Sequence, residues 1–518
     1  MIRSHARWLK RATLVAILAA PSLWMFFAIP PLWKDIDAYL QVTAPPQAGP
    51  FILYGPVTCL VPRAFFYLGQ IYECMKTGAA LPSLDFFAHP TLSDPGVWLL
   101  LGAQHLGLVA GALFLITSAA RKFLARLLVA LLWAVNPLFY VWAHCVGSEA
   151  LSLIIVLFMS AVGLRIVRGE RRWFLFGALL VLAMLTRHIN GVLAALLPIA
   201  FGAAAFANFF AARQRVHRVR RWLCFRARKN FQRAALAVAV GLACIAISSI
   251  TFRGLSYAAG VPYQSSFGFT FLFRLNFLAS LSISERAALL ERVQQRTNSP
   301  GVKLLLDRFA TAPAQGDKLD VMALLADAQR EFAARPASAK ADFRAVLNEN
   351  ARAFLLPPTP EHLHAMRVDF QRAFTVSIYS ALYQAFGATT YLFPDGKRDL
   401  LCARLTTFRN FSAAHLLSLP KQYRYLRRRS FTYARLILLW CVLLIASAIR
   451  RRRLTIAGIY AIALTAVGLL AMLATNMVDE LQARFTLPMW ELTICSAVIL
   501  IGHLLERKRK LHRARTAG

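Results

Sequence analysis

The chain has little negative charge. Only 24 of its 518 residues are Asp or Glu, against 60 Lys and Arg, so the formal net charge is +36. Charged residues make up 16% of the chain, whereas soluble domains carry about 25%. Hydrophobic residues reach 58%, and the mean hydropathy is +0.52. A soluble protein with this composition would expose too much hydrophobic surface to water. The composition therefore excludes a disordered or ordinary soluble protein and indicates that the chain lies in a bilayer.

Cysteine patterns are also lacking. The eight Cys are scattered, with no CxxC motif and no Cys/His cluster of zinc spacing, which excludes a disulfide-rich secreted scaffold and gives no redox or haem signal. We find no internal repeat and no low-complexity tract. The basic excess does not indicate nucleic-acid binding, because most Lys and Arg flank apolar segments, where they set membrane topology.

Long apolar runs are abundant, and a membrane helix needs about 20 apolar residues. We predict an all-α polytopic membrane protein with about ten transmembrane helices. The expected spans are 12–33, 97–119, 123–143, 149–167, 172–187, 190–211, 234–252, 431–449, 454–475 and 485–505. The pair 172–187 and 190–211 has a second interpretation, a re-entrant or distorted hairpin. The first run resembles a signal peptide but continues to Trp33 without a convincing cleavage site, which favours an uncleaved anchor.

Clusters of Lys and Arg predict the orientation. With ten spans and a cytoplasmic N-terminus, every cluster falls on the cytoplasmic side, as the positive-inside rule requires. The clusters lie near residues 3–11, 121–126, 168–172, 213–233, 450–453 and 507–515. The 213–233 stretch is also expected to touch anionic lipid headgroups. The Ala- and Arg-rich composition and short loops suggest a bacterial inner (plasma) membrane, with both termini cytoplasmic and the outer loops periplasmic.

Two outer segments are long, 34–96 and 253–430. The second is predicted to be a soluble, mainly helical insert: Ser282 and Glu285 have capping-box spacing, and prolines separate its apolar runs. The chain therefore divides into an N-terminal transmembrane module (1–252), the insert (253–430) and C-terminal transmembrane helices with a basic tail (431–518).

Acidic residues concentrate on the predicted outer side. Eleven lie outside the insert; Glu170 and Glu506 are predicted to be cytoplasmic, Glu491 lies within the last span, and the other eight are in outer loops. These eight are Asp35, Asp37, Glu73, Asp85, Asp94, Glu149, Asp479 and Glu480. Negative charge can simply remain outside when Lys and Arg are drawn inside. A carboxylate at the membrane surface also suits a general base for a hydroxyl acceptor.

The segment KDIDAYL at 34–40 holds the first candidate base, Asp35 or Asp37, with Tyr39 as an aromatic or hydroxyl group beside it. An ordinary polar helix cap is the alternative. FFAHP at 86–90 places His89 in the same outer segment, where a plain turn is the alternative.

Three later patterns carry charge at predicted span ends. Ser148-Glu149 opens a span, and helix capping is its alternative role. Arg187-His188 separates two apolar runs; a guanidinium there suits a phosphate, or a structural salt bridge with an outer acid. Glu480 and Arg484 are expected one helical turn apart, either as site residues or as a surface pair.

Together these patterns resemble the GT-C fold glycosyltransferases, integral membrane enzymes that take a sugar from a polyprenyl-phosphate donor and include protein O-mannosyltransferases and lipid A aminoarabinose transferases. The matches are D-x-x-x-Y at Asp35 and Tyr39, the His89-Pro pair, the Ser148-Glu149 opening, the stretch from 151 to LTR at Arg187, and E…R-F-x-x-P at 480–488. The resemblance covers 12–211 well, 454–505 loosely and 253–430 not at all. The acids are Asp-Ile-Asp rather than adjacent Asp-Glu, and Phe485 stands where Tyr is common.

The resemblance implies an inverting transfer at the outer face. Asp35 or Asp37 would deprotonate the acceptor hydroxyl, and polyprenyl phosphate would leave toward Arg187, with His188 or Arg484 assisting. Tyr39, His89, Glu149 and Glu480 would contribute to substrate binding. Some members use a divalent metal, but no dedicated ligand set is visible here, so we expect no cofactor. The partners would be the lipid-linked donor, a hydroxyl acceptor (lipid, glycan or protein) and membrane lipids.

Three other functions remain open on the same residues. A transporter or flippase for lipid-linked sugars would also need outer and intramembrane charges, although midplane polar groups and a repeat are typical of that class. A ligase or polymerase acting on lipid-linked sugars would share the donor. A scaffold would use the 253–430 insert to bind a partner.

Overall fold

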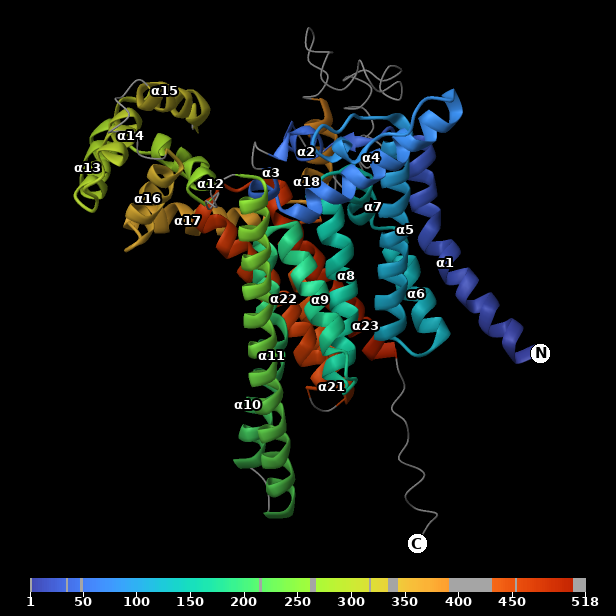
Figure 1. Cartoon of the computed structure of the whole chain (residues 1–518). Helices are drawn as coiled ribbons and strands as arrows, with labels where there is room; N and C mark the ends of the chain where they lie inside the picture. The colour runs from blue at the N-terminus through green and yellow to red at the C-terminus, as the bar shows by residue number, and fades with distance from the viewer. Residues whose placement is uncertain are drawn as a thin grey trace.

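A computed structural model describes residues 2–33, 36–46, 50–213, 217–260, 267–315, 318–333, 343–390, 431–451 and 454–505. These residues are almost entirely helical, with four two-residue strands. The prediction of an all-α polytopic membrane protein with a mainly helical insert is confirmed. Figure 1 shows a bundle of long helices with a separate helical lobe beside one end.

Eight described helices are long and apolar enough to cross a membrane, or nine when one bent pair counts as a span. The eight are Arg7–Ala28 within α1 (Ile2–Ala28), α5 (Asp94–Ala119), α8 (Ser148–Val167), His188–Arg213 (η3, His188–Ala195, with α10, Leu196–Arg213), Val219–Ala258 within α11 (His217–Ala258), α21 (Tyr433–Arg451), α22 (Ile456–Val478) and Ala483–Leu505 (η8, Ala483–Thr486, with α23, Leu487–Leu505). The fifth expected run is the shorter helix α9 (Trp173–Thr186), which fits the distorted-hairpin interpretation.

The bent pair has a local cause. Helices α6 (Phe123–Ala134) and α7 (Pro137–Ala143) meet at 64°. Pro137 has no N–H for the preceding helix and ends it. Asn136 restarts the chain, because its side-chain oxygen accepts a hydrogen bond from the Leu138 N–H at 3.1 Å.

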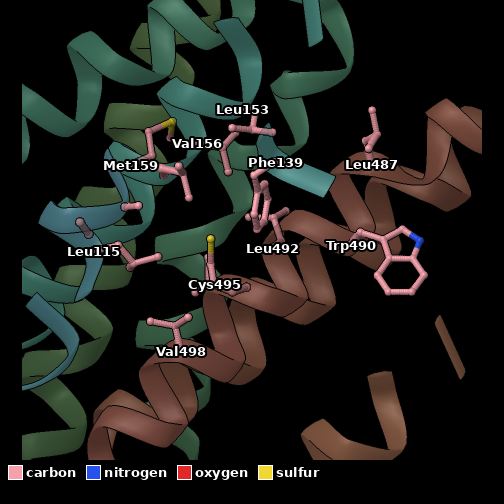
Figure 2. Packing of buried hydrophobic residues seen from close by; sticks show 14 of the residues in the cluster. Leu115, Phe139, Leu153, Val156, Met159, Leu487, Trp490, Leu492, Cys495 and Val498 are labelled. Atoms are coloured by element: carbon pink, nitrogen blue, oxygen red, sulfur yellow. The ribbon is translucent and has the colours of Figure 1, made fainter. Parts of the chain in front are cut away.

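The bundle core lies around α8, α22 and α23. Figure 2 shows Leu153, Val156 and Phe139 gathered near Leu492 and Cys495 of α23. Small residues allow close helix approach: Gly163 lies under the Tyr460 ring, whose hydroxyl donates to the Ser160 carbonyl at 3.0 Å. Away from water, each such polar group needs an internal partner.

The two ends of the bundle differ. The beginning of α1, the α10–α11 turn and the end of α23 lie at one end, which we call the basic end; helices α2, α3 and α18 lie at the other, the α2 end (Figure 1). At the basic end, Arg165 donates to Ser118 Oγ at 2.9 Å, Arg168 donates to the Ser118 carbonyl, and Arg451 donates to the His503 carbonyl at 2.9 Å. Cations thus pair with groups at helix C-termini, as the helix dipole favours.

Helix α11 projects past the basic end (Figure 1). Its 42 residues correspond to about 63 Å. Arg233 lies over the Phe201 ring at 5.6 Å, and Phe201 lies 6.0 Å from the Trp173 ring at the start of α9. His217 is 16 residues before Arg233, so this part of α11 extends about 24 Å beyond the start of α9. Contact of this stretch with lipid headgroups stays a prediction.

The 34–96 segment folds onto the α2 end as α2 (Ile36–Thr43), α3 (Pro50–Leu53), α4 (Pro56–Thr77) and η2 (Leu84–Phe87). Arg63 of α4 is fully buried and donates to the carbonyls of Ala44 at 2.5 Å and Phe87 at 2.7 Å. One guanidinium thus ties the chain after α2 and the end of η2 to α4, and its burial lowers its pKa.

The insert is divided between two cores. Its lobe consists of α12 (Phe267–Arg274), η4 (Leu275–Ser280), α13 (Ile283–Gln294), α14 (Pro300–Thr311), β3 (Ala314–Gln315), β4 (Lys318–Leu319), α15 (Val321–Ala333) and α16 (Phe343–Leu355). Helices α17 (Pro360–Ala373) and α18 (Ile378–Thr390) contribute instead to the bundle core. The expected capping box is present, since the Glu285 N–H donates to Ser282 Oγ and the Ser282 N–H to Glu285 Oε2.

We predict that the α4–α5 contact tolerates no side chain. A Cβ on Gly69 would lie 2.4 Å from the Gly96 nitrogen, so Gly69→Ala should cost about 1–3 kcal/mol of stability. Gly202 in α10 has nothing within 4 Å of an added Cβ, so Gly202→Ala should instead gain up to about 1 kcal/mol. Unfolding midpoints of the purified variants in detergent would check both signs; equal midpoints for the two variants would contradict this packing.

Candidate functional site

Three charged side chains meet at the α2 end of the bundle. Glu149 is the second residue of α8, Arg187 directly follows α9, and Glu491 is the fifth residue of α23. Arg187 Nη1 lies 3.4 Å from Glu149 Oε1, and the Glu149 side chain is 2% exposed. Glu491 is also buried. Glu149 and Arg187 lie at helix ends, whereas Glu491 is the ninth residue of the Ala483–Leu505 span.

A small recess beside this cluster has room for about one water molecule. Its walls combine the three charged residues and Ser152 with apolar side chains, namely Leu138, Phe139, Leu153, Leu487 and Pro488. A neighbouring recess of similar size shares Ser152 and Glu491 and adds Asn190. Such a space suits a water molecule or a small polar group beside the charged side chains.

Hydrogen bonds orient the polar groups at the recess. Asn190 Nδ2 donates to Ser152 Oγ at 3.0 Å and to the Ala183 carbonyl at 2.9 Å. Ser148 Oγ donates to Glu149 Oε2 at 3.1 Å. Glu491 Oε1 is buried and finds no hydrogen-bond partner among the described residues. Burying an unsatisfied carboxylate oxygen is costly, so this atom marks the recess as a place for a polar ligand, a proton or water.

A parallel two-strand ladder joins the residues just before the first outer segment to the strand that precedes Glu149. Strand β1 (Leu32–Trp33) pairs with β2 (Cys145–Val146), with Leu32 opposite Cys145 and Trp33 opposite Val146. The strands are parallel, so both chains leave the ladder in the same direction. One continues into Ser148-Glu149 and the other into KDIDAYL. Asp35 lies outside the described residues; for Asp37 and Tyr39, only their place in α2 is described.

The first outer segment also packs directly behind Arg187. Thr58 Oγ1 donates to the Thr186 carbonyl at 2.7 Å, across 128 residues of sequence. Gly55 has φ +99°, and a Cβ there would lie 2.4 Å from the Leu185 carbonyl oxygen. Only glycine fits both this backbone conformation and this approach. The start of α4 is thereby fixed against the turn that carries Arg187.

The insert is fastened over the same end by residues 479–484. Glu480 accepts hydrogen bonds from Asn276 at 3.0 Å and from Lys318 at 3.3 Å, and the Arg484 N–H donates to Gln384 of α18 at 2.6 Å. Helix α18 also contacts β1, α7 and η8. Residues 479–482 are not helical, so the expected one-turn spacing of Glu480 and Arg484 is wrong.

The two histidines occupy different positions. The His188 ring lies 4.8 Å from the Phe252 ring of α11, at the turn directly after Arg187. His89 is exposed beyond η2, where its backbone N–H donates to the Asp85 carbonyl at 3.1 Å. Among the described contacts, none joins His89 to Glu149, Arg187 or Glu491. Its role in substrate binding stays a prediction.

Glu491, Ser152 and Asn190 were missed as site residues. A carboxylate inside an otherwise apolar span was the available signal for Glu491, since such residues are usually functional. Ser152 and Asn190 gave no sequence signal beyond ordinary helix positions. In the described part of the chain, no three His, Cys, Asp or Glu side chains form a group suited to a metal ion.

Asp479, the residue after α22, is a buried member of the 479–484 segment that holds the insert. Its Oδ1 accepts the Glu480 N–H at 2.8 Å, and Arg274 of the insert donates to its carbonyl at 3.4 Å. Burial raises the pKa of the Asp479 carboxyl to about 7, although the Glu480 N–H bond and Arg484 oppose this shift. The attachment of the insert thus includes an acid that titrates near neutrality.

In comparisons with known proteins, the chain matches no family model, no curated protein and no solved structure.

We predict an unequal cost for breaking the buried ion pair. Arg187→Gln removes the cation facing two buried carboxylates and should cost about 3–5 kcal/mol. Glu149→Gln leaves Arg187 near Glu491 and should cost less. Adding Glu149→Gln to Arg187→Gln should recover part of the loss, because one uncompensated charge disappears. Unfolding midpoints in detergent test this order; a larger loss for Glu149→Gln than for Arg187→Gln would contradict it.

Asp479 predicts a pH-dependent stability. Between pH 4 and 7 the folded state holds a proton that the unfolded state has released, so the free energy of unfolding falls as pH rises through this window. Asp479→Asn keeps an acceptor for the Glu480 N–H and removes the charge. It should match the wild type at pH 4 and exceed it by about 1–4 kcal/mol at pH 8. Unfolding midpoints across this range test it, with exposed Asp85→Asn as the control; a constant difference would disprove it.

Proposed function

We propose that the chain is an integral membrane glycosyltransferase of the GT-C type. It transfers a sugar from a polyprenyl-phosphate donor to an acceptor hydroxyl at the outer face, with inversion. The observation that carries the proposal is the packing of the first outer segment. It contacts the turn of Arg187 through Thr58 and Thr186, and it follows directly after β1, which pairs with the strand that leads into Glu149.

In this proposal Asp35 or Asp37 takes the proton of the acceptor hydroxyl. The hydroxyl oxygen then forms a bond to the anomeric carbon from the face opposite the phosphate. The bond between that carbon and the phosphate oxygen breaks, and its electron pair leaves on the phosphate. Attack opposite the leaving group inverts the anomeric centre.

Arg187 receives the leaving phosphate in this mechanism. A guanidinium has five N–H donors, and the ion pair of Arg187 with Glu149 uses one nitrogen. Glu149 therefore acts as an orienting partner that holds the guanidinium at the rim. Stabilising charge that develops on the leaving phosphate in a partly dry recess is a large electrostatic contribution to catalysis. A rim position also suits a donor whose lipid tail stays in the bilayer.

The remaining candidates surround this centre. Tyr39 and His89 belong to the first outer segment, and His188 follows Arg187. Glu480 and Arg484 hold the insert over the α2 end, which suits a role in acceptor recognition. The proposed location is the bacterial inner membrane, with the basic end in the cytoplasm and the α2 end in the periplasm. No metal or other cofactor is part of the proposed reaction.

Transport of a lipid-linked sugar is the second candidate, because the buried carboxylates Glu149 and Glu491 beside Arg187 resemble a coupling site. Transporter sites lie near the bilayer midplane between repeated halves. Here Glu149 and Arg187 lie at helix ends. Their position favours a transferase over a transporter.

We predict loss of sugar transfer when the base or the phosphate ligand is removed. The purified full chain would be given a panel of radiolabelled polyprenyl-phosphate sugars, and transfer of label to an acceptor or to water would be measured. Asp35→Asn/Asp37→Asn should lower the rate by about 10²–10⁴-fold, and Arg187→Gln by about 10²-fold or more. Asp85→Asn, an exposed acid of the same segment, is the matched control and should keep wild-type activity.

Other outcomes separate the alternatives. Donor that crosses vesicle membranes with its glycosidic bond intact would support transport instead. Full activity of the Asp35/Asp37 double variant would disprove their role as base. Binding of none of the donors would reject both functions and direct attention to partners of the insert.

A further inference from the structure

Two buried histidines connect three helices at the α2 end. His105 of α5 and His144, which follows α7, lie with His105 Nε2 3.0 Å from His144 Nδ1. His105 Nδ1 lies 3.1 Å from Ser22 Oγ of α1, and His144 Nε2 lies 3.0 Å from the Ile29 carbonyl oxygen. All three side chains are at least nine-tenths buried. The function proposed above uses none of them.

The donor and acceptor of each hydrogen bond in the series Ser22–His105–His144–Ile29 follow from the Ile29 carbonyl and the neutral state of His144. The Ile29 carbonyl can only accept, so His144 Nε2 carries the proton. Burial lowers the pKa of the His144 imidazole to about 4, so this ring is neutral near pH 7. Its Nδ1 is then an acceptor, so His105 Nε2 carries its proton and donates to it. His105 Nδ1 in turn accepts from the Ser22 hydroxyl. Both rings are therefore neutral Nε2–H tautomers, each fixed by the next.

The Ile29 carbonyl needs this donor because of the sequence that follows it. Helix α1 ends at Ala28, and the last carbonyls of a helix lack partners within the helix. Pro30 and Pro31 have no N–H, so the chain just beyond the helix supplies fewer donors. The His144 side chain supplies the donor to the Ile29 carbonyl. The His144 backbone carbonyl accepts the Leu32 N–H at 3.2 Å. One residue thus forms hydrogen bonds to the backbone on both sides of the two prolines.

The hydrogen bonds of His144 fix the backbone just before the segment that carries the candidate base. Leu32 and Trp33 form β1, paired with Cys145 and Val146 directly after His144. KDIDAYL begins at the next residue along the chain, so the Ile29–Trp33 turn is the described part of the structure that precedes it. An ordinary buried histidine would contribute packing alone. Here the ring and the backbone of one residue both bond the turn, and a second histidine selects its tautomer.

We propose that His144 is a positioning residue, oriented by His105, that fixes the α1–β1 turn and thereby the segment carrying Asp35 and Asp37. The catalytic part of this inference rests on the proposed glycosyltransferase function. The structural part, namely the tautomers and the order of the turn, can be tested without any activity. Neither histidine touches the reacting atoms.

The structural test uses the full-length protein in lipid. Nitrogen NMR of ¹⁵N-histidine-labelled protein, assigned by single His→Gln variants, should show both rings neutral with the proton on Nε2. Hydrogen exchange of peptides covering residues 30–43 should be at least tenfold faster in His144→Phe, which lacks the donor. His144→Gln offers an N–H close to the position of Nε2 and should restore slow exchange. His503→Gln, at the basic end, is the control and should leave this peptide unchanged.

The catalytic test measures sugar transfer in the same variants. His144→Phe should lower kcat by about 10–100-fold with little change in KM for the donor, because the base is misplaced while the phosphate ligand is intact. His144→Gln should recover to within a few-fold of the wild type. A merely structural role would instead lower the amount of folded protein and leave kcat per folded molecule unchanged.

The outcomes of the two tests are distinguishable. A proton on Nδ1 of His144, or unchanged exchange of residues 30–43 in His144→Phe, would overturn the positioning role whatever the activity. Normal kcat per folded molecule in His144→Phe would overturn its catalytic part. An inactive wild type with the expected tautomers and exchange would reject the proposed function and leave the fixed turn standing.

Discussion

The pairing of backbone groups where α1 ends is the constraint on which the α2 end depends. Inside a membrane protein, a carbonyl without a partner costs several kcal/mol, and the two prolines after Ile29 remove the nearest donors. His144 and the β1–β2 ladder satisfy these groups. Because the ladder is only two residues long, it joins two distant parts of the chain at one point, just after α1 and just before α8.

A second set of contacts fixes the charged turn after α9. Gly55 and Thr58 hold the start of α4 against the carbonyls of Leu185 and Thr186. Arg187 follows directly, and its guanidinium faces Glu149 across the recess. Such a buried pair contributes little net stability, since desolvation offsets most of the attraction. Keeping a cation and two carboxylates together is more readily understood as chemistry than as a device for stability.

The insert shows how one segment can serve two cores. Its lobe has a separate hydrophobic core, while α17 and α18 belong to the bundle. Arg274, Glu480 and Arg484 connect the lobe and α18 to the loop before α23. Because α18 contacts β1 and η8, the insert and the candidate site share structural elements.

The helical membrane class, the approximate position of every expected apolar run, the gathering of basic turns at one end and the Ser282 capping box could all be predicted from sequence. These features depend on composition and local spacing, which a single chain displays directly. The Ser148-Glu149 helix start and the turn at Arg187 were also visible, because charge interrupts an apolar pattern there.

The meeting of these residues was decided by tertiary structure alone. Neither periodicity nor motif spacing indicates that Trp33 lies opposite Val146, that Thr58 reaches Thr186, or that Glu491 shares a recess with Glu149. The contacts of Glu480 and Arg484 with the insert were likewise not visible in the local sequence. Local sequence determines where helices form and stop, whereas partners more than a hundred residues apart are chosen by packing and by the need to pair every buried polar group.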